Sequence, residues 1–372
     1  MPVMAHPIAE PIHTRVSLLI YNPIIEQEGG RQLNQLLGWN DPDQLCARYI
    51  QDVREASHGV VHYQIVERIE LDRFPMLEDG FRYTDGQFLR NWRARGGWHQ
   101  PQMADYRAIL RDADFVPKLE ANQTDELWVF GFPYAGFYES CMGGRGAIWC
   151  NGPVIPGTER VSRRFVVMGF NYERGVGEML EDLGHRAENI MEHVFRDIPD
   201  VGVPEGVGES VHRVSWFDKL LGAIGLRQTA RPERPNYVGS VEGSNVNRAA
   251  AMVNGQLSMV NLHGNLWRQF IRYDQSHPGL AACGNVHFAP SSQRDYDWGN
   301  ARAILSNADD WLNYPEFTGE TKQVQCAEWG NGDIRLHHLW WMKRFPHVTG
   351  QTPTGKTNNW WEPIIDPNKL EI

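Results

Sequence analysis

The sequence predicts a single large α/β domain with a mixed, mostly parallel sheet, helices on both faces and a loop-rich aromatic coat. Strand-like apolar runs alternate with helical segments along the first half of the chain, which is typical of a partly parallel sheet. The 372 residues can bury a large core, and 41% hydrophobic and 22% charged residues indicate a folded globular protein. We expect a catalytic-type domain over residues 14–345, with a candidate lid at 199–235 and a C-terminal wrapping segment at 346–372.

Local patterns predict the elements of this domain in order. Short apolar runs rich in β-branched and aromatic residues predict strands, and periodic segments opened by Asp or Pro predict helices. Residues 72–97 are rich in turn signals such as Asp79-Gly80 and are expected to form loops. The expected strands are 15–23, 60–71, 125–132 and 165–168, and the expected helices are 43–56, 105–112, a long one from about Gly175 to Val194, and 258–273.

Charge and hydropathy exclude some classes of partner. The formal net charge is −10 and no Lys/Arg-rich block is present, so nothing favours binding to nucleic acid or to an anionic membrane surface. No apolar run approaches the roughly 18 residues that span a bilayer. The N-terminal segment lacks the features of a signal peptide, but a mature secreted chain would share this property. Cellular location and oligomeric state therefore stay open.

The five cysteines are too few and too scattered for a disulfide scaffold. Cys141 and Cys150 flank a glycine-rich loop, where a bridge between them is one option. The odd number leaves at least one thiol free or paired between chains.

One stretch, residues 163–194, carries the strongest chemical signal. It begins as an apolar strand, turns through a polar segment and continues as a long helix. On that helix Glu181, His185 and Glu188 stand at positions i, i+4 and i+7, so their side chains share one face. Carboxylate and imidazole groups from successive turns are a common way to bind one divalent cation, and zinc is the expected metal.

The same spacing is also compatible with an ordinary solvent-exposed helix face. The apolar residues of the helix gather on the opposite side, as in any amphipathic surface helix. Gly184 favours the metal or catalytic interpretation, because glycine inside a helix is unfavourable and suggests the close approach of another backbone.

A second segment supplies a further candidate ligand. His287 follows the apolar Val286 and precedes a dense polar and aromatic run that contains Asp295, Asp297 and Trp298. Catalytic zinc is usually held by three protein ligands with one open position for water. His287 is therefore a candidate ligand from a different element, and either Glu188 or His287 would complete the set with Glu181 and His185.

Candidate catalytic and substrate-binding residues surround these ligands. Asp182 or Glu178 would act as the general base, and Arg174 or Tyr172 would stabilise developing charge. The loop at 131–146 follows a predicted strand, so it should lie at the carboxyl end of the sheet, where ligands bind in open α/β folds. It carries the polar candidates Tyr134, Tyr138, Glu139 and Arg145, and the candidates for substrate binding are Tyr134, Tyr138, Trp128 and Trp298.

Two alternatives need no metal. A glycoside hydrolase would use a pair of carboxyl groups, and the candidates are Glu126, Glu139, Glu181, Asp295 and Asp297. The 14 tryptophans and 12 tyrosines provide flat faces that could stack on sugar rings. A non-catalytic carbohydrate-binding protein would use the same faces without turnover.

Three blocks of the sequence, DELWVFGFPYAGFYES, RRFVVMGFNYERGVGEMLEDLGHRAENIM and GNVHFAPSSQRDYDWGN, resemble those of a poorly characterised bacterial and fungal family whose members are often secreted. The resemblance extends from the first strand to Tyr314. Some members have His at the position of Glu181, which would form a His-x-x-x-His pair with His185.

The segment Glu181-Asp-Leu-Gly-His185 also resembles the His-Glu-x-Gly-His helix of zinc metallopeptidases. Glu181 replaces the first His of that pattern and Asp182 replaces its catalytic Glu. This resemblance implies a zincin-like, metal-dependent hydrolase that acts on a peptide or another polymer.

Overall fold

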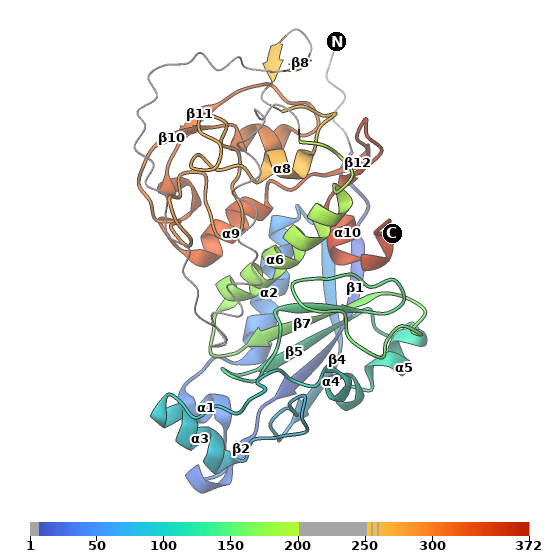
Figure 1. The fold of residues 1–372 in the computed structure, drawn as a ribbon, viewed down its shortest axis with the longest axis vertical. Helices are drawn as coiled ribbons and strands as arrows, with labels where there is room; N and C mark the ends of the chain where they lie inside the picture. Colours follow the sequence, from blue (N-terminus) through green and yellow to red (C-terminus); the bar gives the residue numbers. More distant parts are fainter. Residues whose placement is uncertain (1–6, 201–250, 254–255, 259, 372) are drawn as a thin grey trace, which may run out of the picture.

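The protein is an α/β domain built on a five-stranded mixed sheet, as predicted (Figure 1). The computed structural model describes residues 7–200, 251–253, 256–258 and 260–371. The strand order is β4-β1-β5-β7-β6, and all neighbouring strands run parallel except the antiparallel pair β6 and β7. The strands of this sheet are β1 (Ile12–Tyr21), β4 (Val61–Leu71), β5 (Glu126–Gly131), β6 (Ser140–Gly143) and β7 (Phe165–Asn171).

Helices and short hairpins fill the rest of the described chain. The helices are α1 (Leu33–Leu37), α2 (Pro42–Ala56), α3 (Asp85–Ala94), α4 (Tyr106–Asp112), α5 (Phe115–Glu120), α6 (Val176–Val194), α8 (Leu266–Phe270), α9 (Ile334–Met342) and α10 (Trp361–Ile365). Short 3-10 helices are η1 (Glu26–Glu28), η2 (Ala308–Asn313), η3 (Cys326–Trp329) and η4 (Pro367–Lys369). The two-stranded hairpins pair β2 (Ile24–Ile25) with β3 (Arg31–Gln32), β8 (Ala251–Val253) with β9 (Gln256–Ser258), β10 (Ile304–Ser306) with β11 (Lys322–Val324), and β12 (His347–Gln351) with β13 (Thr357–Asn359).

Both faces of the sheet are covered by helices. On one face, Tyr49 of α2 packs edge-on against Trp128 of β5, with ring centroids 5.2 Å apart. On the other face, Phe115 of α5 packs against Phe165 of β7 at 5.1 Å. Every residue of β5 is buried, which explains why this central strand is a continuous apolar run rather than an alternating one.

The C-terminal part of the chain packs over α6. In Figure 1, α8 and α9 lie above the sheet and α6 runs between them and the strands. Trp267, Phe270 and Trp360 form a fully buried aromatic cluster in this region, and Phe270 lies 5.3 Å from Trp360. Trp341, Trp360 and Trp361 are fully buried and Trp340 is partly buried, so these tryptophan pairs belong to the packed interior and not to an outer coat.

Two predictions of secondary structure are wrong. The helix expected at 258–273 is reduced to α8, because Asn265 ends the preceding turn and accepts a hydrogen bond from the Arg268 backbone N–H. The expected loop at 72–97 contains α3. Its start is fixed by Thr84 and Gln87, which form a capping box.

The remaining predictions about the chain concern thiols, membranes and the lid. All five cysteines are buried and free, so Cys141 and Cys150 are not bridged. No helix in the described ranges is long and apolar enough to cross a membrane. The candidate lid at 199–235 lies, from residue 201 onward, outside the described residues.

Candidate metal and catalytic site

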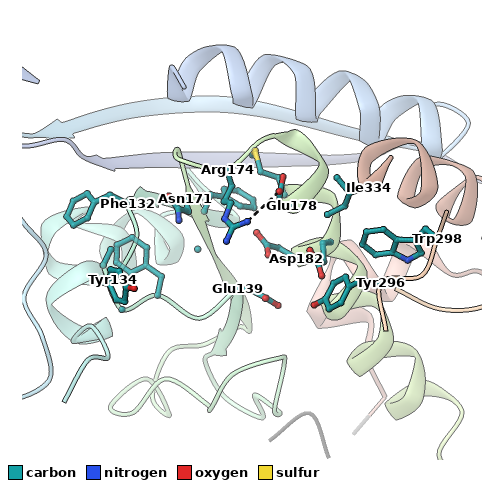
Figure 2. A pocket seen from close by; sticks show the side chains of 17 residues that line it. Phe132, Tyr134, Glu139, Asn171, Arg174, Glu178, Asp182, Tyr296, Trp298 and Ile334 are labelled. Atoms are coloured by element: carbon teal, nitrogen blue, oxygen red, sulfur yellow. Dashed lines mark ion pairs between the residues drawn. The ribbon is translucent and has the colours of Figure 1, made fainter. Parts of the chain in front are cut away.

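A cavity of about 560 Å³ opens at the carboxyl ends of β5 and β7 (Figure 2). This is the edge of the sheet at which the loop 131–146 was expected. Its wall is formed by residues that follow the two strands, by the first turns of α6, and by the segment around Tyr296. The lining side chains include Phe132, Tyr134, Phe137, Glu139, Asn171, Arg174, Glu178, Glu181, Asp182, Tyr296, Trp298 and Ile334.

Helix α6 is held against the covering segment by a close contact at Gly184. A Cβ atom at Gly184 would lie 2.7 Å from Val286 Cγ2, so only glycine allows this approach. The close neighbour is thus a side chain and not the backbone that the sequence suggested. Because Val286 precedes His287, the contact brings His287 onto α6. His185 is only 4% exposed, so this face of the helix is not a solvent-exposed one.

The turn that carries His287 is built by local hydrogen bonds. Gly284 has a φ of 73°, a left-handed conformation that favours glycine. The Asn285 side-chain oxygen accepts hydrogen bonds from the backbone N–H groups of His287 and Phe288, each at 3.0 Å. This Asx turn fixes the direction in which the His287 imidazole leaves the loop.

Three of the predicted ligands converge on one point. His185 Nε2 lies 3.1 Å from His287 Nε2, and His287 Nε2 lies 3.5 Å from Glu181 Oε1. The remaining separation, from His185 Nε2 to Glu181 Oε1, is 4.0 Å. Ligand atoms on a tetrahedral zinc ion are about 3.3 Å apart, since each bond is about 2 Å long. The Glu181, His185 and His287 group can therefore hold a divalent cation, with small adjustments.

Glu188, the fourth predicted ligand, has a different position. Its Oε2 lies 3.2 Å from His185 Nδ1, and its Oε1 accepts a hydrogen bond from the Val286 backbone N–H at 3.2 Å. The carboxylate therefore binds the far side of the imidazole and points His185 Nε2 toward the other ligands. This is the usual outer partner of a metal-binding histidine.

Asp295 approaches the second imidazole in a similar way. Its Oδ1 lies 3.8 Å from His287 Nδ1, while the Tyr296 hydroxyl lies 3.1 Å from His287 Nε2. Each histidine of the group thus has a carboxylate near its Nδ1 atom. Such carboxylates fix the tautomer and raise the basicity of the ligand.

The electrostatics of the group follow from this concentration of carboxylates. Burial alone would lower the pKa of His185, but Glu139, Glu188 and Glu181 raise it to about 9. Burial would raise the pKa of Glu181, but the His287 hydrogen bond and the nearby histidines lower it below its ordinary value. The surplus of negative charge around the two imidazoles favours the binding of a cation.

The pKa of Asp182 is shifted in the opposite direction to that of Glu181. Burial, and then repulsion by Glu139, Glu181 and Glu178, raises its pKa well above the ordinary range. This environment favours a protonated Asp182. A protonated carboxyl group cannot accept a proton, so the environment of Asp182 does not favour its predicted role as a general base.

Glu139 is better placed to act as a base. Its side chain is 37% exposed, and its Oε2 lies 3.9 Å from His185 Nε2. The Asn151 side chain donates a hydrogen bond to the same oxygen. In Figure 2, Glu139 and Asp182 project into the cavity from opposite walls.

Several predicted residues line the cavity away from the ligands. Tyr134 and Trp298 do so, as expected for substrate binding, and Arg174 and Glu178 lie on its upper wall in Figure 2. Arg174 Nη1 is 3.9 Å from Glu178 Oε1. The Glu178 carboxylate also accepts a hydrogen bond from the Gly175 backbone N–H at 3.1 Å, which caps α6 and leaves Glu178 less free to act as a base.

Three predicted site residues, Trp128, Tyr172 and Glu126, are buried in the interior and do not line the cavity. Trp128 is fully buried between Tyr49 and Phe170, so it is a core residue and does not line the cavity. Tyr172 is also fully buried, and its hydroxyl donates to the Tyr21 carbonyl at 3.2 Å.

Glu126, one of the candidate carboxylates, is paired with the buried Arg186 at 2.8 Å. Its second carboxylate oxygen accepts a hydrogen bond from the Trp128 indole. Glu126 is therefore engaged in the interior and is not available for catalysis.

Two further candidates lie beside the site. Tyr138 lines a separate cavity of about 150 Å³ with Tyr106. Asp297 accepts hydrogen bonds from the Gln293 backbone and the Asn300 side chain, so it stabilises its own loop.

The structure adds residues that the sequence did not single out. Asn151 contacts Glu139, and Tyr296 contacts His287. In the sequence, only its place in the polar and aromatic run after His287 pointed to Tyr296. His338, expected to be structural, is buried near Glu181, and its Nδ1 lies 2.7 Å from the Ile334 carbonyl.

No model of a known protein family matches the chain, and no curated protein matches it either.

Proposed function

We propose that the protein is a metal-dependent hydrolase in which Glu181, His185 and His287 hold a divalent cation, with zinc as the best fit. The observation that carries this proposal is the mutual approach of three ligand atoms from two elements, within 4.0 Å of one another. Imidazole and carboxylate ligands in a three-residue set are typical of catalytic zinc sites.

The chemistry follows from the neighbours of this group. A cation held there would raise the acidity of a bound water molecule. Glu139 lines the cavity and its Oε2 lies 3.9 Å from His185 Nε2, so it would accept the proton of the attacking water. It would then return that proton to the leaving group as the bond in the substrate breaks. Asn151 holds Glu139 in position.

The substrate would be a peptide or another polymer that carries a hydrolysable bond. The cavity is open, and its polar wall includes Arg174, which could stabilise negative charge on the substrate. The Glu181-Asp-Leu-Gly-His185 segment supports a zincin-like arrangement, although here the third ligand would come from the 284–298 segment.

A metal-independent glycoside hydrolase is the second candidate. It is favoured by one observation: Glu139 and Glu181 both lie within 4.0 Å of His185 Nε2, so two carboxyl groups share one cavity. Such a pair is what glycoside cleavage requires. In that case the same cavity would work without any bound metal.

Elemental analysis of protein purified without chelator or polyhistidine tag distinguishes the two. We expect about one zinc or other transition-metal ion per chain, and activity on a panel of peptides, esters and glycans that a chelator removes and added metal restores. His287→Ala should lose both metal and activity. His263→Ala, at an exposed histidine, should keep both. Active protein without metal would overturn the proposal and support the glycoside hydrolase.

A further inference from the structure

Two exposed tyrosines stand at opposite sides of the cavity. Tyr134 is 44% exposed and Tyr296 is 55% exposed, although most large apolar side chains of the described chain are buried. Figure 2 shows them on opposite sides of Glu139 and Asp182. A ligand that passes over Glu139 and Asp182 would therefore meet an aromatic ring on each side.

The backbone of both tyrosines is in an unfavourable conformation. Tyr134 has a φ of 68° and Tyr296 a φ of 59°, in the left-handed region that bulky residues seldom adopt. Such a conformation costs free energy, and residues of this kind cluster at binding sites and active sites. The presence of two such tyrosines at one cavity indicates that the position of each ring serves ligand binding.

The Tyr134 ring is stacked on a neighbouring aromatic ring and is otherwise partly exposed. Trp98 stacks on it with centroids 3.8 Å apart and ring planes 15° from parallel. Trp98 in turn packs on Phe88 at 5.6 Å, which anchors the pair to α3. The opposite face of Tyr134 is the natural contact surface for a flat, weakly polar ring.

Between the tyrosines the cavity wall is polar. Asn171, Arg174 and Glu178 offer an amide, a guanidinium and a carboxylate along the ends of β7 and α6. Hydroxyl groups can both donate to and accept from groups of this kind. A ligand with apolar ring faces and many hydroxyls, a carbohydrate chain, satisfies both parts of the cavity.

In the described part of the chain, the sheet edge beside the cavity is not free to pair with an extended peptide. Peptides in extended form commonly bind by adding a strand to an exposed sheet edge. The edge strand next to the cavity is β6, which begins directly after Glu139, and all four of its residues are buried. The following segment covers it, since the Ile155 N–H donates to the Met142 carbonyl at 2.9 Å and Ser140 Oγ donates to the Cys150 carbonyl.

From these contacts we infer that the substrate is a chain of neutral sugar rings that carries acyl groups, bound between Tyr134 and Tyr296. The inference rests on the proposed metal-dependent hydrolysis for its chemical step. Water would attack the acyl carbon of an amide or ester on one sugar, and the bond from that carbon to the sugar nitrogen or oxygen would break. The products are a free carboxylic acid and a sugar with a free amine or hydroxyl, and no other reactant is consumed.

Binding and hydrolysis test this inference separately. The probes are oligosaccharides of glucose, xylose, mannose and N-acetylglucosamine, their O-acetylated forms, and a set of extended acetylated peptides, each measured by calorimetry. We expect at least one oligosaccharide series to bind, and the peptides not to bind. His185→Ala should retain sugar binding while it loses hydrolysis. Failure of the metal proposal alone would leave binding intact and remove only the acyl-transfer step.

Two variants examine the role of the Tyr134 ring. Tyr134→Gly should weaken oligosaccharide binding about tenfold or more, as expected for one lost stacking contact. The melting temperature of this variant should change little. Glycine removes the strain of the left-handed backbone at position 134, and this gain offsets the loss of stacking on Trp98. Trp149→Ala removes an exposed aromatic side chain outside the cavity and should leave binding unchanged. Binding of peptides, no binding by any oligosaccharide, or equal effects of the two variants would overturn the inference.

Discussion

Two pairs of neighbouring histidines in the described part of the chain have different surroundings. His185 and His287 meet at 3.1 Å between α6 and the 284–298 segment, while His337 and His338 are neighbours on α9. Their ring centroids are separated by similar distances, 4.8 Å and 5.1 Å. Proximity is thus common to both pairs, and His185, His337 and His338 are buried while His287 is partly buried.

The difference lies in the carboxylates. Glu139, Glu181 and Glu188 raise the pKa of His185 to about 9 against the effect of burial. On α9, burial lowers the pKa of His338 to about 4, and neither ring nitrogen of His337 has a hydrogen-bond partner in the described chain. His337 instead stacks on Trp298 at 5.1 Å. Of these two pairs, the one that is a candidate metal site is the pair accompanied by carboxylates.

The largest expected effect separates the two pairs directly. His185→Ala removes a ligand and should abolish stoichiometric metal binding together with activity. His337→Phe should keep the metal, because His337 contributes no contact to the ligand group. Inductively coupled plasma analysis of both variants checks this comparison. Equal metal loss in both variants would mean that the α9 pair takes part in the site.

Replacement of the proposed base should affect turnover but not metal content. Glu139→Gln keeps the shape and the Asn151 contact but cannot accept a proton at neutral pH. We expect kcat to fall by about 10²–10⁴, the usual contribution of a general base. Metal content is the control, and a variant with full activity would exclude Glu139 from the proton transfer.

The two pairs should also give opposite pH dependences of stability in metal-free protein. The folded pKa of His185 is about 9, above its ordinary value of 6.5, so its stabilising effect is complete below pH 6.5 and is lost as pH rises to 9. The folded pKa of His338 is about 4, so its contribution is complete above pH 6.5 and is lost as pH falls to 4.

Denaturant unfolding across this pH range measures both effects. For shifts of this size the change is on the order of 3 kcal/mol. His185→Ala should flatten the alkaline side of the stability profile, and His338→Phe should flatten the acidic side. A wild-type profile that neither variant alters would contradict the pKa shifts assigned to His185 and His338.

The outer carboxylate of His185 should have a smaller influence. Glu188→Gln leaves all three ligands in place but weakens the contact to His185 Nδ1. We expect metal affinity to fall by about 10–100-fold, which is typical for outer partners of a metal ligand. Glu192→Gln is the matched control, because Glu192 lies on the same helix and pairs only with Arg268 at 2.9 Å in the described chain. Competition with a metal indicator measures both values.

The smallest expected effect is on the stability of His337→Phe. Because the ring nitrogens of His337 have no partner among the described residues, their removal should cost no hydrogen bond. The free energy of unfolding should change by about 1 kcal/mol or less, allowing for the slightly larger ring. A much larger loss would reveal a polar interaction of His337 in solution.

The sequence predicted the sheet and the face of α6 that carries Glu181, His185 and Glu188, because both depend on local periodicity. It also offered His287 as a candidate to join this face, from the polar run that surrounds it. It did not separate Glu188 from the ligands, since a spacing of i+3 from His185 is equally suited to binding a metal or the imidazole itself. The distinction depends on Val286, which binds the other oxygen of Glu188 and comes from a distant part of the chain.

Other errors have similar causes. Trp128 and Tyr172 have the residue types of a binding site, but Trp128 is covered by Tyr49 of α2 and Tyr172 packs against Trp39, so both are buried. The helix α3 was missed because Gly86 suggested a turn, although Thr84 and Gln87 carry a capping signal. Tertiary packing explains the errors at Trp128 and Tyr172, and the overlooked capping box of Thr84 and Gln87 explains the missed helix.

The most direct test of the central claim is a crystal structure of zinc-loaded protein with anomalous data collected at the zinc edge. We predict one strong anomalous peak about 2.0–2.2 Å from His185 Nε2, His287 Nε2 and a Glu181 carboxylate oxygen. Glu188 should remain bound to His185 Nδ1 and outside the coordination shell. Absence of a peak at this point, or a peak bound by other residues, would contradict the account.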